Sequence, residues 1–284
     1  MSTPRPDHRR VDHRWIPVPA VLAALTILSQ ITYPLFTGRA LTAVTISVVV
    51  LFAAASLAHA ANSAGVRTAL TVLAVAAGCG LTSELIGVAT GFPFGDYAYA
   101  GTLGPSIAGV PLIIGLAWVM MAWPAFLLGR RLAAGLRGPW RRVAVAAAGG
   151  VALASWDLFL DPQMTAAGHW AFADPSPGLP MVPGVPLTNY AGWLLVSVLI
   201  VAILDRAVAT TDGASPAVPA ALLGWTWLGS TLANAVFFDR PWVALYGFIG
   251  MGLVVGPYLW LLLRASRRAD ERDAARAATT LATR

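Results

Sequence analysis

The sequence predicts an all-α membrane protein, a polytopic bundle of about eight transmembrane helices, and three observations support this prediction. Hydrophobic residues make up 57% of the 284 positions and charged residues only 11%, whereas soluble domains carry about 25% charged residues. The mean hydropathy is +0.70. The apolar residues also fall into separate runs of about 20 residues, which is the length that crosses a bilayer as a helix.

Taken in order, the chain divides into a basic N-terminus at residues 1–14, a transmembrane region at residues 15–264 and a charged tail at residues 265–284. The first apolar run has no small-residue cleavage site after it, so we expect a retained span and not a signal peptide. The predicted spans are residues 15–36, 40–61, 68–89, 109–128, 142–160, 188–204, 217–238 and 242–263.

The arginines give the orientation of these spans. With the N-terminus inside, 17 of the 19 basic residues lie in inner segments, and only Arg39 and Arg240 lie in outer ones. Positively charged loops stay in the cytoplasm, so both termini are predicted to be cytoplasmic in a multi-pass plasma-membrane protein. The pI near 10.2 would otherwise suggest nucleic acid, but this charge flanks apolar segments, so we expect the lipid bilayer as partner and no nucleic acid.

The residue types exclude several kinds of chemistry. The chain contains no lysine, which rules out a lysine Schiff base. Its single cysteine, Cys79, lies within an apolar run, so no disulfide can form inside the chain. The four histidines are scattered without the spacing of metal ligands. We therefore expect neither a metal nor an organic cofactor.

Two long loops, residues 90–108 and 161–187, lie on the outer side and are predicted to be re-entrant or interfacial. Each loop ends in a similar sequence, since GVPLIIGLAW at residues 109–118 returns as GVPLTNYAGW at residues 184–193. The helices that precede the loops both run outward. The two halves are therefore predicted to be parallel repeats about an axis along the membrane normal.

Three acidic residues at the outer ends of helices are the candidates for catalysis. Glu84 lies in an otherwise apolar helix, where a carboxyl group must be paired, solvated or protonated. An apolar pocket would keep it protonated and able to donate a proton, although a structural bond to a neighbouring helix is an alternative. Asp157 and Asp161 are spaced i, i+4 on one helix face, before Pro162, which is expected to end that helix. Such a pair suits acid and base work, a divalent cation or a solvated helix end.

Aromatic and polar residues gather at the same outer level as these carboxyl groups. Aromatic side chains concentrate at membrane interfaces for reasons unrelated to catalysis, but beside carboxylates their faces can also stabilise a cation. The candidates for substrate contact are Phe92, Phe94, Asp96, Tyr97, Tyr99, Trp118, Trp156, Trp170, Asn189, Tyr190 and Trp193.

Several of these motifs resemble the membrane carotenoid biosynthesis family typified by the CruF-type hydratases. They are TGFPFGDYAY at residues 90–99, LGPSIAGVPL at residues 103–112, and DLFLDPQ at residues 157–163 running through HWAF to GVPLTNYAGW. The resemblance covers roughly residues 81–193. It implies a lipophilic carotenoid substrate, no redox cofactor, association with other carotenoid enzymes, and addition of water across the terminal C1,C2 double bond of an acyclic end.

In this interpretation, Glu84 or one of Asp157 and Asp161 protonates the double bond and another carboxyl group positions the water. Two alternatives remain. A membrane prenyltransferase or lycopene elongase-like enzyme would use the DxxxD pattern to bind magnesium, but its diphosphate also wants several basic groups, and the outer side offers only Arg39 and Arg240. A non-catalytic carotenoid carrier or transporter would use the carboxyl groups for proton coupling.

Overall fold

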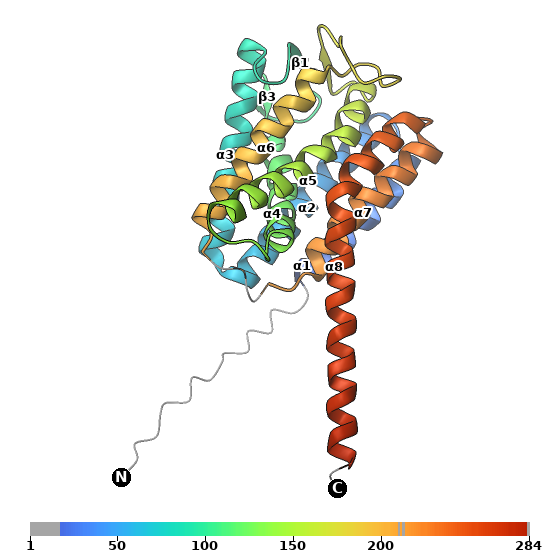
Figure 1. Ribbon diagram of the computed structural model, residues 1–284. Coiled ribbons are helices and arrows are strands. Elements are labelled where there is room, and N and C mark those ends of the chain that lie inside the picture. The colour runs from blue at the N-terminus through green and yellow to red at the C-terminus, as the bar shows by residue number, and fades with distance from the viewer. Residues whose placement is uncertain (1–17, 210, 212–213, 283–284) are drawn as a thin grey trace.

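The computed structural model describes residues 18–209, 211 and 214–282, with side chains described as far as Arg272, and it confirms an all-α membrane bundle (Figure 1). The predicted basic N-terminus, residues 1–14, lies outside the described residues. The α-helices are α1 (Val18–Thr32), α2 (Gly38–Ala64), α3 (Val66–Thr90), α4 (Ile113–Leu132), α5 (Gly138–Ala166), α6 (Leu187–Ala207), α7 (Ala217–Leu232) and α8 (Pro241–Ala282). The predicted charged tail is the continuous end of α8.

Seven of the helices in the described part of the chain are long and apolar enough to cross a membrane. The remaining one, α7, has 16 residues. It is followed directly by a π-helical segment, η2 (Ala233–Phe237), and the two together correspond to the predicted span at residues 217–238. Helix α1 is likewise followed directly by a short 3-10 helix, η1 (Tyr33–Leu35).

Two predicted helix boundaries were wrong. The fifth helix does not end before Pro162 but continues to Ala166, so the helix accommodates the one backbone donor that this proline removes. The fourth helix begins at Ile113 and not at Gly109, since Val110–Pro111 form a short strand, β3. Both changes alter the outer ends of the helices, where the candidate residues lie.

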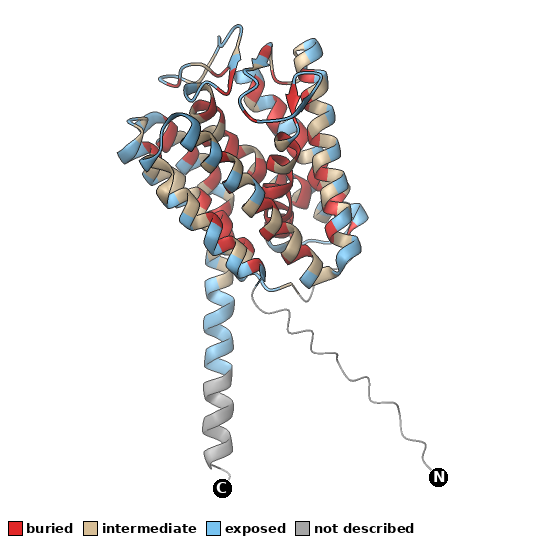
Figure 2. Ribbon diagram, turned by 180° about the vertical axis from the view of Figure 1, so that it is seen from behind, coloured by how far each residue is buried: buried red, intermediate tan, exposed pale blue. Residues whose placement is uncertain are grey.

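Helix α4 occupies the centre of the bundle, and nearly every residue from Ile114 to Gly129 is buried (Figure 2). It packs against α2, α3 and α5. The contact with α5 is close because two glycines face the opposing backbone: a Cβ atom on Gly129 would lie 2.5 Å from the carbonyl oxygen of Val145. Helices α4 and α5 therefore pack backbone against backbone at the centre of the bundle.

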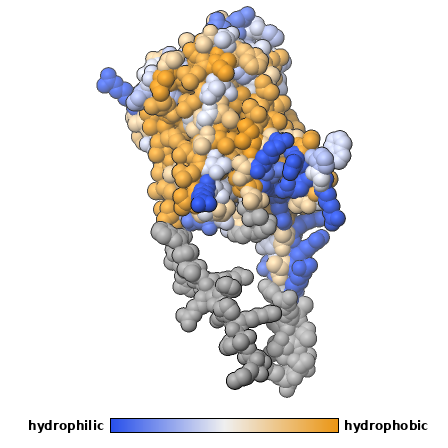
Figure 3. Space-filling view, turned by 90° about the vertical axis from the view of Figure 1, so that its left-hand side faces the viewer, coloured by the Kyte–Doolittle hydropathy of each residue, from blue (hydrophilic) through white to orange (hydrophobic). Residues whose placement is uncertain are grey.

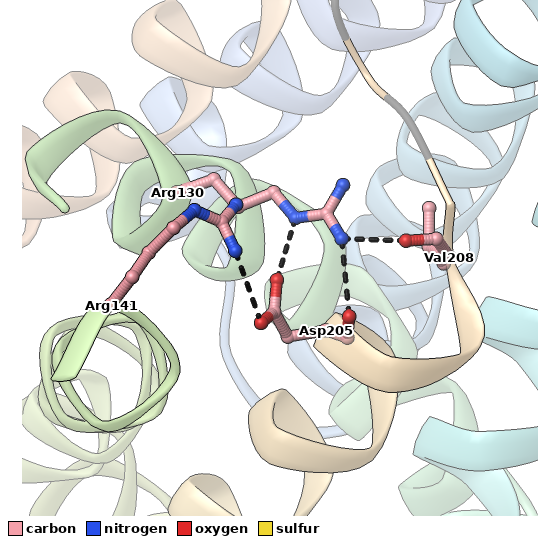
Figure 4. A network of polar contacts seen from close by, with 4 residues as sticks. All are labelled: Arg130, Arg141, Asp205 and Val208. Carbon is pink, nitrogen blue, oxygen red and sulfur yellow. Dashed lines mark hydrogen bonds and ion pairs between the residues drawn. The ribbon is translucent and has the colours of Figure 1, made fainter. Parts of the chain in front are cut away.

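A buried ion pair joins three helices at the ends away from the cap side (Figure 4). Arg130 of α4 donates from Nε to Asp205 of α6 at 2.8 Å, and Arg141 of α5 lies 3.5 Å from the same carboxylate. The Arg130 guanidinium also donates to the carbonyl oxygen of Val208 at 2.5 Å. Removing one partner would leave a buried charge unpaired, so we expect this cluster to hold α4, α5 and α6 together.

The two outer loops pair with each other, which the sequence did not predict. Strand β1 (Tyr97–Tyr99) runs antiparallel to β4 (Trp170–Phe172), with Ala98 opposite Ala171. The pairing continues on both sides, as Ala100 N donates to the carbonyl of His169 at 2.9 Å and Ala173 N donates to the carbonyl of Asp96 at 2.8 Å. A second small sheet joins β2 (Ser106–Ile107) to β3. Together the loops form a cap over one end of the bundle.

The predicted internal repeat is visible in this cap. Strand β1 lies in GDYAY (residues 95–99) and β4 in GHWAF (residues 168–172), and the two pair symmetrically about their central alanines. After each strand, a GVPL segment turns into the next helix through a glycine at φ +85°. Leu112 N then donates to the carbonyl of Pro105, and Leu187 N donates to that of Pro177. The α3–α4 and α5–α6 halves are therefore related by an approximate two-fold axis.

The surface agrees with this orientation. In the space-filling view, apolar side chains cover most of the body, and a large group of hydrophilic side chains lies near the end from which α8 emerges (Figure 3). Exposed apolar residues such as Leu28, Leu195 and Leu253 belong to the outer faces of α1, α6 and α8. These faces fit a lipid environment, and the capped end then lies at the opposite membrane surface.

Candidate active site

Glu84 lies in α3, below the cap, and is only 4% exposed. Its Oε2 atom accepts hydrogen bonds from the hydroxyl of Tyr97 at 2.5 Å and from that of Tyr99 at 2.7 Å. The indole Nε1 of Trp118 in α4 donates to Oε1 at 3.3 Å. Strand β1 thus presents two alternate side chains to one carboxyl group. The helix can pass this close to the strand because it ends at Gly91, which takes the left-handed conformation at φ +78°.

The two phenols are held in their protonated form. Burial raises the pKa of Tyr97 and of Tyr99, and the neighbouring negative charge of Glu84 raises both further. A phenol that keeps its proton can donate a hydrogen bond at any physiological pH. Both residues therefore remain donors to Glu84.

Asp157 and Asp161 form a second acidic group on α5. They are 0% and 3% exposed, and the side-chain amide nitrogen of Asn189 in α6 donates to both, at 2.8 Å to Asp157 Oδ2 and through a shorter contact to Asp161 Oδ2. Asp157 Oδ1 is buried without a hydrogen-bond partner. The two carboxyl groups therefore share one amide nitrogen, and both are buried in the bundle.

One cavity joins the two acidic groups. Glu84, Asp161 and Asn189 all line it. The empty space in the cavity and at its opening to solvent together measures about 1280 Å³. The rest of the lining is mostly apolar and aromatic, as expected of a site for a lipophilic ligand. The aromatic side chains of this lining are Tyr33, Phe94, Tyr97, Tyr99, Trp156, Phe159, Trp170, Phe172, Trp193, Trp225 and Phe238.

The tryptophans of the two repeats meet behind the acidic groups. Trp118 and Trp193 stack with ring centroids 4.0 Å apart and an angle of 16° between their planes, and Trp156 meets Trp193 edge-on at 5.8 Å. Such contacts contribute about 0.5–1.5 kcal/mol each beyond the burial of area. They fix the ring faces, and fixed π faces are the groups that stabilise a positive charge.

The structure separates the predicted site residues into three sets. Those that line the cavity are Glu84, Phe94, Tyr97, Tyr99, Trp156, Asp161, Trp170, Asn189 and Trp193. Asp157, Trp118 and Tyr190 lie outside the lining, and the first two bond directly to residues within it. Phe92 is 64% exposed and Asp96 is also exposed, so neither reaches the cavity.

Sequence reasoning missed the part of the cavity that is formed by α1, η1, α2 and α7. Gln30, Tyr33, Thr45 and Ser230 line it there, with Phe238 beside them. A signal was present, since each is a polar residue in the outer half of a predicted span. In the described part of the chain, no group of three or more histidine, cysteine, aspartate and glutamate side chains is placed to hold a metal ion.

The site therefore belongs to a polytopic membrane protein with an aromatic cavity that holds two acidic groups. Comparison with known families then places the chain. The family described as carotenoid biosynthesis protein matches residues 43–249, which include both acidic groups, and the chain belongs to this family. No solved structure matches it.

A curated relative adds a more specific likeness. The bisanhydrobacterioruberin hydratase of Haloarcula japonica is 34% identical to this chain over 123 residues, which cover 43% of this chain and 40% of the relative. The match thus spans well under half of the relative's length.

Proposed function

We propose that the protein is a carotenoid hydratase, which adds water to the terminal C1,C2 double bond of an acyclic carotenoid end by acid catalysis. The observation that carries the proposal is the single cavity that Glu84 and Asp161 both line, inside a member of the carotenoid biosynthesis family. The name of the Haloarcula japonica relative supports a hydration reaction.

The proposed reaction starts with proton transfer from the Asp157 and Asp161 pair. Asp161 lines the cavity and Asp157 lies outside its lining, so Asp161 gives its proton to C2 while the amide of Asn189 holds the resulting carboxylate. The π electrons of the double bond form the new C2–H bond, and a tertiary cation remains at C1. Proton transfer from a positioned acid of this kind contributes about 10²- to 10⁴-fold to a rate.

Glu84 acts in the second half of the reaction. Its two carboxyl oxygens accept three hydrogen bonds, from two phenols and an indole, which is an arrangement suited to a carboxylate. Its charge faces the cation and orients a water molecule toward C1. The water oxygen forms the C1–O bond and loses one proton, which returns to the acidic groups, so the substrate gains one water overall. Trp193 and Trp156 provide the aromatic faces beside the cation.

The test is expression of the protein in a host that produces lycopene, with the pigments analysed by mass. A gain of the mass of one water per reacted end is expected, and a host that carries the Asp161→Asn variant should give no such product. Unmodified pigment that copurifies with the wild-type protein, with no hydrated product, would support a carrier and contradict the proposal. An activity that gives no hydrated product and is lost on chelation of magnesium would point to the prenyltransferase alternative.

A further inference from the structure

The cavity has a second polar end, away from the acidic groups. Helices α3 and α6, which carry Glu84 and Asn189, pack together on one side of the bundle, whereas α1 packs against α2 and α7 on the other (Figure 1). Between them the cavity passes apolar residues of the central helix, including Ile114 and Met120. At its other end the polar lining residues are Gln30, Tyr33, Thr45 and Ser230, which we call the second polar end.

Gln30 is not satisfied by the protein. Its Oε1 atom is buried and accepts no hydrogen bond. A buried acceptor left without a partner costs about 1–3 kcal/mol, so native proteins rarely keep one unless a ligand or a water molecule completes it. Because Gln30 also lines the cavity, the missing partner has a place from which to bind.

Tyr33 has capacity for a further hydrogen bond. Its hydroxyl is 3.2 Å from Thr45 Oγ1, and a phenol can both donate and accept. Its ring is held edge-on by Phe238 at 6.1 Å between centroids. The guanidinium carbon of Arg240 lies 5.7 Å from the centroid of the Phe238 ring, and its Nη1 atom is buried without a partner. Burial also lowers the pKa of Arg240, and the two ion pairs in the described residues are made by Arg130 and Arg141 instead.

The family match covers the two ends of the cavity to different extents. Glu84 and Asp161 fall inside the region that matches the family, residues 43–249, as do Thr45 and Ser230, whereas Gln30 and Tyr33 come from α1 and η1, which lie outside it. The family match therefore accounts for the acidic end but leaves out the two residues of the second polar end that α1 and η1 contribute.

We propose that the second polar end binds an oxygen substituent, a hydroxyl or a carbonyl, that the polyene carries away from the double bond that reacts. The identity of the ligand as a carotenoid rests on the proposed function. A hydroxyl would donate to Gln30 Oε1 and accept from Tyr33, whereas a pure hydrocarbon would cover both groups without pairing them. Sites with buried polar groups reject the ligand that lacks the matching group.

The test compares the dissociation constants of two polyenes, an acyclic carotenoid hydrocarbon and its monohydroxylated derivative. Binding to the purified full-length protein in lipid nanodiscs is followed by the change in polyene absorbance. The wild-type protein is expected to prefer the hydroxylated polyene. Tyr33→Phe and Gln30→Met each remove one hydrogen bond and keep the side-chain size, so each should reduce this preference roughly three- to tenfold. Tyr246→Phe, which removes a hydroxyl outside the cavity, is the matched control.

The proposal is overturned if both variants keep the wild-type preference, or if they weaken the binding of both polyenes equally. The measurement needs no turnover, so it separates this proposal from the proposed function. Preference for the hydroxylated polyene without any hydrated product would contradict only the proposed function. Hydrated product from a wild-type protein that binds both polyenes equally would contradict only the second polar end.

Discussion

The two halves of the repeat share a backbone but surround their carboxyl groups differently. By the register of β1 and β4, the counterpart of Glu84 in α3 is Asp157 in α5. Glu84 accepts three hydrogen bonds from two phenols and an indole, whereas Asp157 accepts one from an amide and lies beside Asp161. The carboxyl group of the first half is thus surrounded by hydrogen-bond donors, and that of the second half by an amide and another carboxyl group.

A few side chains account for this difference. The counterparts of Tyr97 and Tyr99 in the second half are Trp170 and Phe172, neither of which has a hydroxyl group to donate. Conversely, Asp161 corresponds to Val88 in the first half. In the proposed reaction the two halves therefore take different roles, with Asp161 as the acid and Glu84 as the carboxylate that faces the cation.

The largest effect is expected from a substitution at Asp161, in the half of the repeat that contains α5 and α6. Asp161→Asn removes the proton that the pair would donate, so the initial rate of product formation should fall about 10²- to 10⁴-fold. The rate is measured in membranes with a carotenoid hydrocarbon, and binding is checked by polyene absorbance. Asp96→Asn is the control, because Asp96 lies on the same cap but is exposed. A variant that keeps a tenth or more of the wild-type rate would remove Asp161 from the acid role.

The second largest effect is expected from loss of the Glu84 carboxylate, in the half that contains α3 and α4. Glu84→Gln keeps the shape but removes the charge that faces the developing cation, and the rate should fall about 10²- to 10³-fold. The assay is the same, and Glu271→Gln on the exposed part of α8 is the matched control. Equal rates for Glu84→Gln and the wild type would show that the first half contributes no charge to the reaction.

The sequence predicted these halves only in part. Helix number followed from apolar length, and the expected orientation from arginine placement, because both patterns reflect the bilayer directly. The GVPL repeat predicted the two-fold relation. The sequence placed the counterpart of Glu84 between Asp157 and Asp161, because the second loop has a different length after the strand. The strand pairing between distant loops sets that register, and no local pattern encodes it.

The cavity was predictable at one end only. Glu84, Asp157 and Asp161 are conspicuous because carboxyl groups are rare in spans. Gln30, Tyr33 and Ser230 are uncharged and cost little in a helix, so their positions carry no strong signal until α1 and α7 are brought together. The exposed orientation of Phe92 likewise depends on the turn after Gly91.

A smaller effect is expected when the first half is made more like the second. Tyr99→Phe installs the side chain found at the counterpart position and removes one donor from Glu84. A hydrogen bond to a charged group is worth about 1.5–3 kcal/mol, so the rate should fall at least tenfold. Tyr246→Phe serves as the control outside the cavity. An unchanged rate would mean that Tyr97 and Trp118 alone suffice to hold Glu84.

The smallest effect concerns stability, at the position where the repeats carry Asp96 in one half and His169 in the other. Asp96 is exposed, whereas His169 is 3% exposed, with Nδ1 2.7 Å from Thr102 Oγ1 and with Nε2 buried without a partner. Burial lowers the pKa of His169 below its usual 6.5. The unfolded chain therefore takes up a proton first as the pH falls, and the stability contributed by the neutral imidazole, complete above 6.5, is lost below it.

We expect the thermal unfolding midpoint of the wild-type protein to fall by about 1–2 °C more than that of His169→Gln between pH 7 and pH 5. Thermal unfolding in nanodiscs measures this difference, and comparison with the variant cancels the contribution of His59, which both proteins contain. Asp96→Asn should follow the wild type, since its side chain is solvated at both pH values. If His169→Gln shows the same pH dependence as the wild type, then protonation of the cap in the second half does not couple to folding, and the two halves differ only at their carboxyl groups.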